Sequence, residues 1–95
     1  MTVHIHAGAR EDFFNAVDHF SEISNSVCTA FIDEFESCIR NIETQPTAWT
    51  PIQFDCRRCL FRSFKYSIIY RINGTDIIIL AVMHNSRDPY YWTRR

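Results

Sequence analysis

Polar and aromatic side chains with the chemistry to act on RNA crowd together near the end of the chain. Cleavage of RNA without a metal needs a base for the 2′-hydroxyl, an acid for the leaving oxygen and cations on the phosphate. A histidine or a tyrosine would do the proton transfer, and an arginine would hold the phosphate. The candidates are His84, Arg87, Tyr90, Tyr91 and Trp92, which Arg58, Arg62 and Lys65 could join.

The three aromatic residues of this cluster have a second interpretation, in which Tyr90, Tyr91 and Trp92 close the hydrophobic core beneath the C-terminus. Pro89 restricts the backbone before them and helps to fix their direction. Asp88 adjoins Arg87 and is placed to orient its guanidinium. The sequence leaves open whether these aromatic residues are core or contact residues.

The cysteines show no metal or redox pattern. Cys56 and Cys59 have the spacing of a metal pair, but residues three apart on a strand point to opposite faces, and no second such pair follows. Cys28 and Cys38 lie on different faces of a predicted helix and are interpreted as packing residues. With only two glycines, the chain has no phosphate-binding glycine loop. We therefore expect no metal and no cofactor.

A β-hairpin must position the candidate cluster. Tyr66–Ile72 and Ile77–Met83 are rich in β-branched residues and meet at Asn73 and Gly74, which tolerate the positive φ of a tight turn. The second run is apolar at every position, which is typical of a central strand covered on both faces. The candidate cluster begins where this buried strand ends.

The rest of the chain predicts a helical hairpin on a sheet. Apolar residues three and four apart favour two helices, with N-cap candidates for the second in 24–26. Glu11 and Asp12 are expected in the first turn of the first helix, where their negative charge would interact favourably with the helix dipole. The predicted elements are a strand at 2–7 lying at a sheet edge or pairing with the C-terminal strands, helices at 9–23 and about 27–44, a loop at 45–55 and a strand at 56–61. The expected fold is one α+β domain over 1–95, in the order β-α-α-β-β-β, with the hairpin on a mostly antiparallel four-stranded sheet.

Charge is divided unevenly along the chain. Residues 1–56 carry two cationic and nine acidic side chains, whereas residues 57–95 carry eight cationic and two acidic ones, so a net charge of −1 hides an acidic half and a basic half. The acidic half fits a solvated helical surface, and the basic half fits either a polyanion or an acidic protein segment. No apolar run is long enough to span a membrane, and no secretory signal opens the sequence, so a cytoplasmic protein with reduced cysteines is expected.

Motifs spread over nearly the whole chain resemble the RelE/ParE superfamily of type II toxin–antitoxin toxins. Their order, too, is that of the family: Ala9-Arg10-Glu11-Asp12, Phe31-Ile32-Asp33-Glu34, Pro46-x-x-Trp49, Tyr66-Ser67-Ile68-Ile69-Tyr70-Arg71, Ile78-Ile79-Leu80-Ala81-Val82-Met83-His84 and Arg87-Asp88-Pro89-x-Tyr91-Trp92. The resemblance implies the β-α-α-β-β-β fold, a cognate antitoxin as partner, and contact with operator DNA only through that antitoxin.

Two activities occur in this superfamily. RelE-like members cut mRNA in the ribosome with basic residues and a C-terminal tyrosine, and ParE-like members lack most of that set and poison DNA gyrase. By position, Arg58, Arg87 and Tyr91 fall on or near RelE-like site residues, and His84 would join them. Leu60 and Ser67 fall where those nucleases carry a lysine and an arginine, and losing two cations weakens a phosphate site.

The resemblance therefore favours the ParE-like branch, a gyrase poison that is not an enzyme. In that branch the expected target- or partner-binding residues are Arg62, Lys65, Arg87, Tyr91 and Trp92. The first alternative is a RelE-like, metal-independent endoribonuclease acting on ribosome-bound mRNA. The second is a non-toxic RNA- or protein-binding domain.

Overall fold

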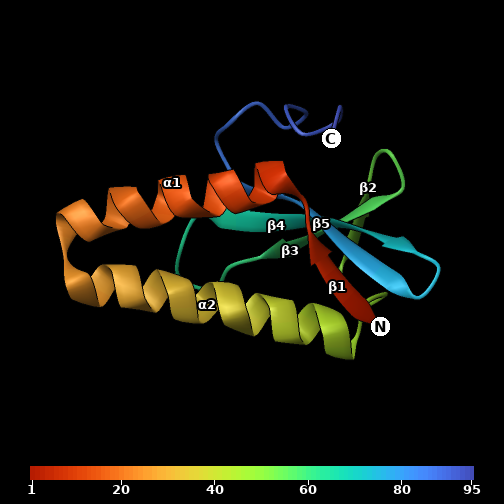
Figure 1. Ribbon diagram of the computed structural model, residues 1–95, viewed down its shortest axis with the longest axis horizontal. Coiled ribbons are helices and arrows are strands. Elements are labelled where there is room, and N and C mark those ends of the chain that lie inside the picture. Colours follow the sequence, from red (N-terminus) through yellow and green to blue (C-terminus); the bar gives the residue numbers. More distant parts are fainter.

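The computed structural model describes residues 1–95 and contains two helices and five strands, arranged as Figure 1 shows. In chain order the elements are β1 (Thr2–Ile5), α1 (Ala7–Ile23), α2 (Asn25–Thr44), β2 (Thr50–Ile52), β3 (Cys56–Leu60), β4 (Tyr66–Asn73) and β5 (Asp76–His84).

The strands form one sheet in the order β1-β5-β4-β3-β2. β1 runs parallel to β5, and every other neighbouring pair is antiparallel. The predicted edge position of the first strand is confirmed, as is the central position of the apolar strand β5. Gly74 adopts the predicted positive φ, 62°, at the turn between β4 and β5.

The sheet has five strands, so the prediction of four was wrong. β2 lies within the segment interpreted as loop, and its three residues pair antiparallel with β3, Thr50 opposite Arg58 and Ile52 opposite Cys56. Its sequence, Thr-Pro-Ile, is too short to show alternation, and Pro51 removes one backbone donor. An outer edge strand tolerates that loss because one side of it is unpaired.

The first helix begins two residues earlier than predicted, at Ala7. His6, expected on the strand, is instead its N-cap, and its Nδ1 accepts the Gly8 N–H at 2.9 Å. Glu11 and Asp12 consequently lie beyond the first turn, so the predicted interaction of their charge with the helix dipole is wrong. Only Ser24 separates the two helices, and its predicted capping role is confirmed by a 3.1 Å hydrogen bond from the Val27 N–H.

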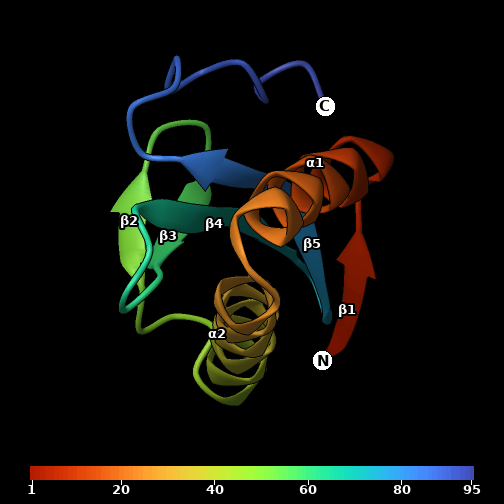
Figure 2. The ribbon, with the colours of Figure 1, turned by 90° about the vertical axis from the view of Figure 1, so that its left-hand side faces the viewer.

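Each face of the sheet has its own cover, as the end view in Figure 2 shows. α1 and α2 pack on one face over a core in which Phe31, Ile42 and Ile79 are fully buried. The C-terminal tail, residues 85–95, crosses the opposite face over a smaller core that includes Leu80 and Met83. The helical face thus holds most of the buried apolar residues, and the tail shields the smaller core on the second face from water.

The cysteines divide between these two cores as predicted, Cys59 on the helical side and Cys56 on the tail side. Cys38 is buried on α2, and a hydrogen bond to Cys59, together with burial, raises the pKa of its thiol. Neither helix combines the length and apolar character needed to cross a membrane.

Candidate functional site at the C-terminal tail

The tail is anchored at both ends of its path across the sheet. At its start, the Asn85 N–H donates to the Lys65 carbonyl at 2.9 Å. Near its end, Trp92 is only 2% exposed and packs in the core beside Ile69 and Met83. Its indole N–H has no hydrogen-bond partner. Trp92 is therefore a core residue and not a surface contact. The sequence had left both interpretations open for the aromatic residues of the tail.

Asp12 on α1 is the residue that fastens the tail to the helices. Its buried carboxylate accepts hydrogen bonds from the Tyr91 hydroxyl at 2.9 Å and from Arg95 Nη1 at 2.7 Å. The backbone N–H of Val82 on β5 donates to the same carboxylate at 3.2 Å. We call Asp12, Tyr91 and Arg95 the tail clamp. Arg95 also donates to the Leu80 carbonyl at 2.9 Å, so the clamp joins α1, β5 and the tail.

Arg87 lies on the outside of the tail clamp. Its guanidinium carbon sits 3.5 Å above the centre of the Tyr91 ring, a cation–π contact. Its Nη1 is 3.8 Å from Asp12, and its side chain remains 53% exposed. Asp88, predicted to orient Arg87, instead accepts the Tyr90 N–H at 3.0 Å. Tyr91 and Asp12 therefore aim Arg87 toward solvent.

The clamp raises the pKa of both Tyr91 and Arg95. Burial, together with the hydrogen bond to Asp12, raises the pKa of Tyr91 well above its usual value, so the phenol stays neutral and donates. The same hydrogen bond to Asp12 raises the pKa of Arg95. Because the Tyr91 proton is committed to Asp12, this phenol is poorly placed to transfer a proton to a substrate.

A second polar cluster lies beside the start of the tail, where β3, β4 and Asn85 meet. Arg58 Nε donates to the Ser67 hydroxyl at 2.9 Å, and its Nη2 donates to Asn85 Oδ1 at 3.0 Å. Ser67 is fully buried and donates to the same amide oxygen at 2.6 Å. These contacts hold the Arg58 side chain against the sheet.

The predicted cluster is therefore only partly gathered. His84 and Arg87 line one small cleft of about 150 Å³ beside α1, whereas Arg58 lines a different one of about 220 Å³ beside Tyr90. His84 Nδ1 accepts the Ser86 N–H at 3.1 Å. The Lys65 side chain is exposed at the β3–β4 turn.

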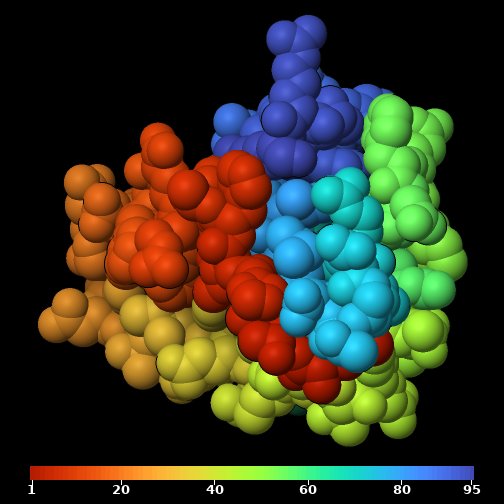
Figure 3. Space-filling view, turned by 45° about the vertical axis from the view of Figure 1, so that its right-hand side comes forward, coloured from red at the N-terminus to blue at the C-terminus, as the bar shows by residue number.

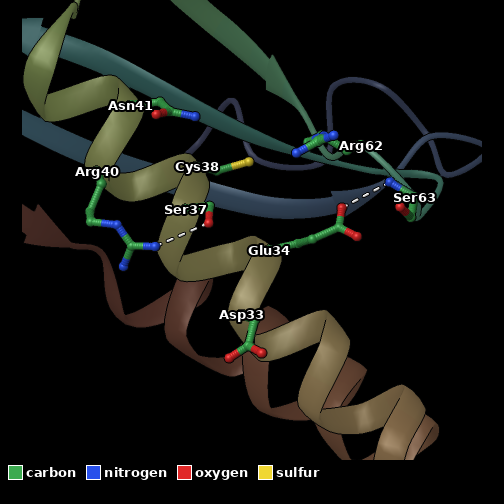
Figure 4. Close-up of a pocket in the computed structure, with 8 residues that line it drawn as sticks. All are labelled: Asp33, Glu34, Ser37, Cys38, Arg40, Asn41, Arg62 and Ser63. Carbon is green, nitrogen blue, oxygen red and sulfur yellow. Dashed lines mark hydrogen bonds between the residues drawn. The ribbon is translucent and has the colours of Figure 1, made fainter.

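Arg62 lies apart from these clefts, in a polar groove of about 620 Å³ between α2 and the β3–β4 turn. Figure 4 shows the carboxylates of Asp33 and Glu34 on the α2 side and Arg62 on the turn side. Glu34 accepts the Ser63 N–H at 2.9 Å. The groove's mixed charge favours neither an anionic nor a cationic ligand. Arg62 thus does not share a site with Arg87 or Tyr91.

Two residues of the tail clamp were missed by sequence reasoning. Asp12 was interpreted as a helix-dipole residue, and Arg95 entered only as part of the basic half. No local sequence signal marks this pair, because Asp12 and Arg95 lie 83 positions apart in the chain. No three His, Cys, Asp or Glu side chains converge closely enough to hold a metal ion.

Comparison with known proteins agrees with this geometry. The family model described as "ParE toxin of type II toxin-antitoxin system, parDE" matches residues 3–89. Toxin ParE2 of Mycobacterium tuberculosis, in strains CDC 1551 / Oshkosh and ATCC 25618 / H37Rv, is 27% identical over 86 residues, which is 90% of this chain and 82% of the relative. The solved "Chromosomal ParDE TA system from P. aeruginosa" matches with a TM-score of 0.78 at 17% identity, covering 88% of this chain and 95% of that one.

The chain shares the fold of that solved structure, a helical hairpin on a mixed five-stranded sheet. It belongs to the ParE toxin family. This assignment supports the ParE-like branch over the RelE-like alternative, and it makes a cognate antitoxin the partner of this protein.

Proposed function

We propose that this toxin poisons DNA gyrase and does not cleave mRNA in the ribosome. The observation that carries the proposal is the environment of Ser67, where RelE-like nucleases carry a cation. Ser67 is fully buried and bonded to Asn85, so this position presents no charge to a phosphate. Leu60, the other such position, is 55% exposed and apolar. Neither position therefore supplies a cation to stabilise the charge of a reacting phosphate.

The tail clamp gives independent support. A RelE-like reaction needs its C-terminal tyrosine near the reacting phosphate, and the Tyr91 hydroxyl is instead bonded to buried Asp12. Arg58 and Arg87, the two cations that remain, line separate clefts. A net charge of −1 also disfavours binding to ribosomal RNA, because affinity grows with the number of phosphates neutralised.

Two assays with the purified toxin test this function. The first measures supercoiling by DNA gyrase in the cytoplasmic ionic conditions in which a gyrase poison would act, and the second measures cleavage of ribosome-bound mRNA. We expect supercoiling to be inhibited and the mRNA to remain intact. Cleavage at codons with gyrase unaffected would reverse the assignment in favour of the RelE-like activity.

We further propose that the antitoxin binds the helical hairpin and the free edge of β1 through an acidic, amphipathic segment that folds as it binds. An apolar groove of about 160 Å³ lies there between β1, α1 and α2, with Arg10 at its side and Phe14 54% exposed. The free edge of β1 offers unpaired backbone groups to an added strand. Operator DNA would be bound by the antitoxin and reached by the toxin only through it.

Calorimetry of toxin–antitoxin association at several salt concentrations tests this partner surface. Coupled folding buries a large apolar area, so we expect a strongly negative heat-capacity change. Phe14→Ala should weaken the complex, because it removes the exposed aromatic side of the groove. A heat-capacity change near zero would contradict the coupled folding, and unchanged affinity of Phe14→Ala would place the antitoxin elsewhere.

A further inference from the structure

The turn between β2 and β3 is held in an unusual backbone conformation. Phe54 and Asp55 have φ angles of 61° and 59°, in the left-handed region that glycine and asparagine adopt most readily. A phenylalanine there is strained, and such strain is common where a side chain is displayed for a function. Neither positive-φ position of this turn holds a glycine, so Phe54 and Asp55 carry the backbone strain.

This turn displays an exposed pair of aromatic rings. Phe54 is 58% exposed, and its ring stands edge-on to that of Tyr90, which is 46% exposed, with the centres 6.0 Å apart. The hydrogen bond from the Tyr90 N–H to Asp88 holds the second ring in place. Figure 3 shows the turn (green) and the tail (blue) side by side at one end of the molecule. Tyr90 is thus a surface residue, whereas Trp92 beneath it is core.

An apolar groove of about 220 Å³ adjoins the aromatic pair. Its main lining comes from Ile52, Ile69, Met83, Pro89, Tyr90 and Arg58. Arg58 is the only charged residue along it, and no carboxylate lines it. Because Ser67 and Asn85 hold Arg58 through Nε and Nη2, its position is fixed before anything binds.

We propose that this groove, together with the Phe54–Tyr90 aromatic pair beside it, is where the toxin binds its target protein, and that it takes an apolar side chain of the target followed by a carboxylate. The inference rests on the proposed function, since it names the toxin surface that engages gyrase. Rigid aromatic residues beside a fixed arginine are the usual anchors of protein interfaces. The charge of the groove complements a carboxylate, and the apolar lining excludes a simple phosphate site.

A protein segment fits this surface better than a nucleic acid does. Nucleic-acid sites combine aromatic residues with several cations along a backbone path, and this groove has one arginine. The groove is also separate from the surface proposed for the antitoxin, because its residues Ile69 and Met83 belong to the core beneath the tail, on the face opposite the helices.

Variants at the two aromatic residues test the groove. Phe54→Asn removes the ring but keeps a residue that tolerates positive φ, so the melting temperature should hold or rise while growth inhibition is lost. Tyr90→Ala should also abolish growth inhibition, and each variant should bind purified gyrase about tenfold or more weakly. Ile23→Ala, which removes an equally exposed apolar side chain (60%) at the far end of α1, is the matched control.

Growth inhibition, antitoxin affinity and circular dichroism are measured on the same variants. Loss of toxicity with normal folding and normal antitoxin affinity is the expected result. Full toxicity in both variants would overturn the groove, as would weakened antitoxin binding with toxicity retained. Binding of a single-stranded oligonucleotide that Tyr90→Ala abolishes would replace the protein occupant with a nucleic acid and also overturn it.

The gyrase proposal is judged separately, on the wild-type toxin. Suppose that wild-type toxin leaves supercoiling intact but Phe54→Asn and Tyr90→Ala lose growth inhibition. The gyrase proposal is then wrong, and the groove binds a different target protein. If wild-type toxin inhibits gyrase and both variants inhibit it equally well, the groove is wrong and the gyrase function stands.

Discussion

Asp12→Asn is the substitution that most directly tests how the tail is held. The side chain keeps its size but loses its charge, and the amide places a donor where Tyr91 and Arg95 each need an acceptor. Hydrogen bonds to a charged group contribute about 1.5–3 kcal/mol each. Arg95 retains 19% of its side-chain exposure, so water recovers part of its loss. We expect a loss of about 3 kcal/mol, the lower end of the cost of breaking a buried ion pair.

Equilibrium urea denaturation and differential scanning calorimetry measure this loss. A domain of this size shifts its melting temperature by about 4–8 °C for each kcal/mol, so Asp12→Asn should lower it by at least about 12 °C. Asp18→Asn, on an exposed stretch of the same helix, is the control and should stay within about 0.5 kcal/mol of wild type. The m-value should not change, because the fold is the same.

A double-mutant cycle with Arg95→Gln separates the ion pair from the other contacts of Asp12. If the two residues act as a unit, the combined loss should fall short of the sum of the single losses by about 1 kcal/mol or more. Additive losses, or a loss below about 1 kcal/mol for Asp12→Asn, would refute the clamp as the fastening of the tail.

Three further outcomes follow from the same geometry. Trp92→Ala should cost about 3 kcal/mol or more by chemical denaturation, whereas Trp92→Phe should cost much less, because the indole N–H has no partner. Arg87→Ala should leave the melting temperature nearly unchanged and abolish growth inhibition, and full toxicity would make Arg87 structural. Burial raises the pKa of Tyr70 to about 12 and also raises that of Tyr91, against 10.0 in the unfolded chain. The unfolded chain therefore loses these protons first, so unfolding free energy should be fully retained below pH 10 and fall from pH 10 to 12, less steeply in Tyr70→Phe.

The parts of the fold that sequence predicted are those with a local cause. Asn73 and Gly74 require a tight turn, and the apolar run after them requires burial on both faces, so the hairpin and the central strand were both confirmed. Three-residue β2 has no local cause, because its pairing with β3 depends on a turn at Phe54 and Asp55 that contains neither glycine nor asparagine. The sequence therefore predicted a loop over the whole of 45–55.

The tail clamp could not be predicted because its partners are far apart in sequence. Asp12 and Arg95 belong to different halves of the chain, and charge counts do not say which acid meets which base. Gly8 shows the same limit. It lies in the first turn of α1, where a Cβ atom would collide with the Arg95 side chain from the other end of the sequence. The glycine allows Arg95 to pass over the helix and reach Asp12.

The two faces of the sheet give this toxin two separable surfaces. The helical face and β1 carry the groove proposed for the antitoxin, and the opposite face carries the groove proposed for the target, whose Pro89 and Tyr90 belong to the tail. The target groove therefore exists only while the tail is fastened, and the fastening residue, Asp12, is on a helix of the antitoxin side. It follows that Asp12→Asn should lower both stability and toxicity, whereas Phe54→Asn should lower toxicity alone. A toxin that kept full activity with its tail released would show that the target never contacts the tail.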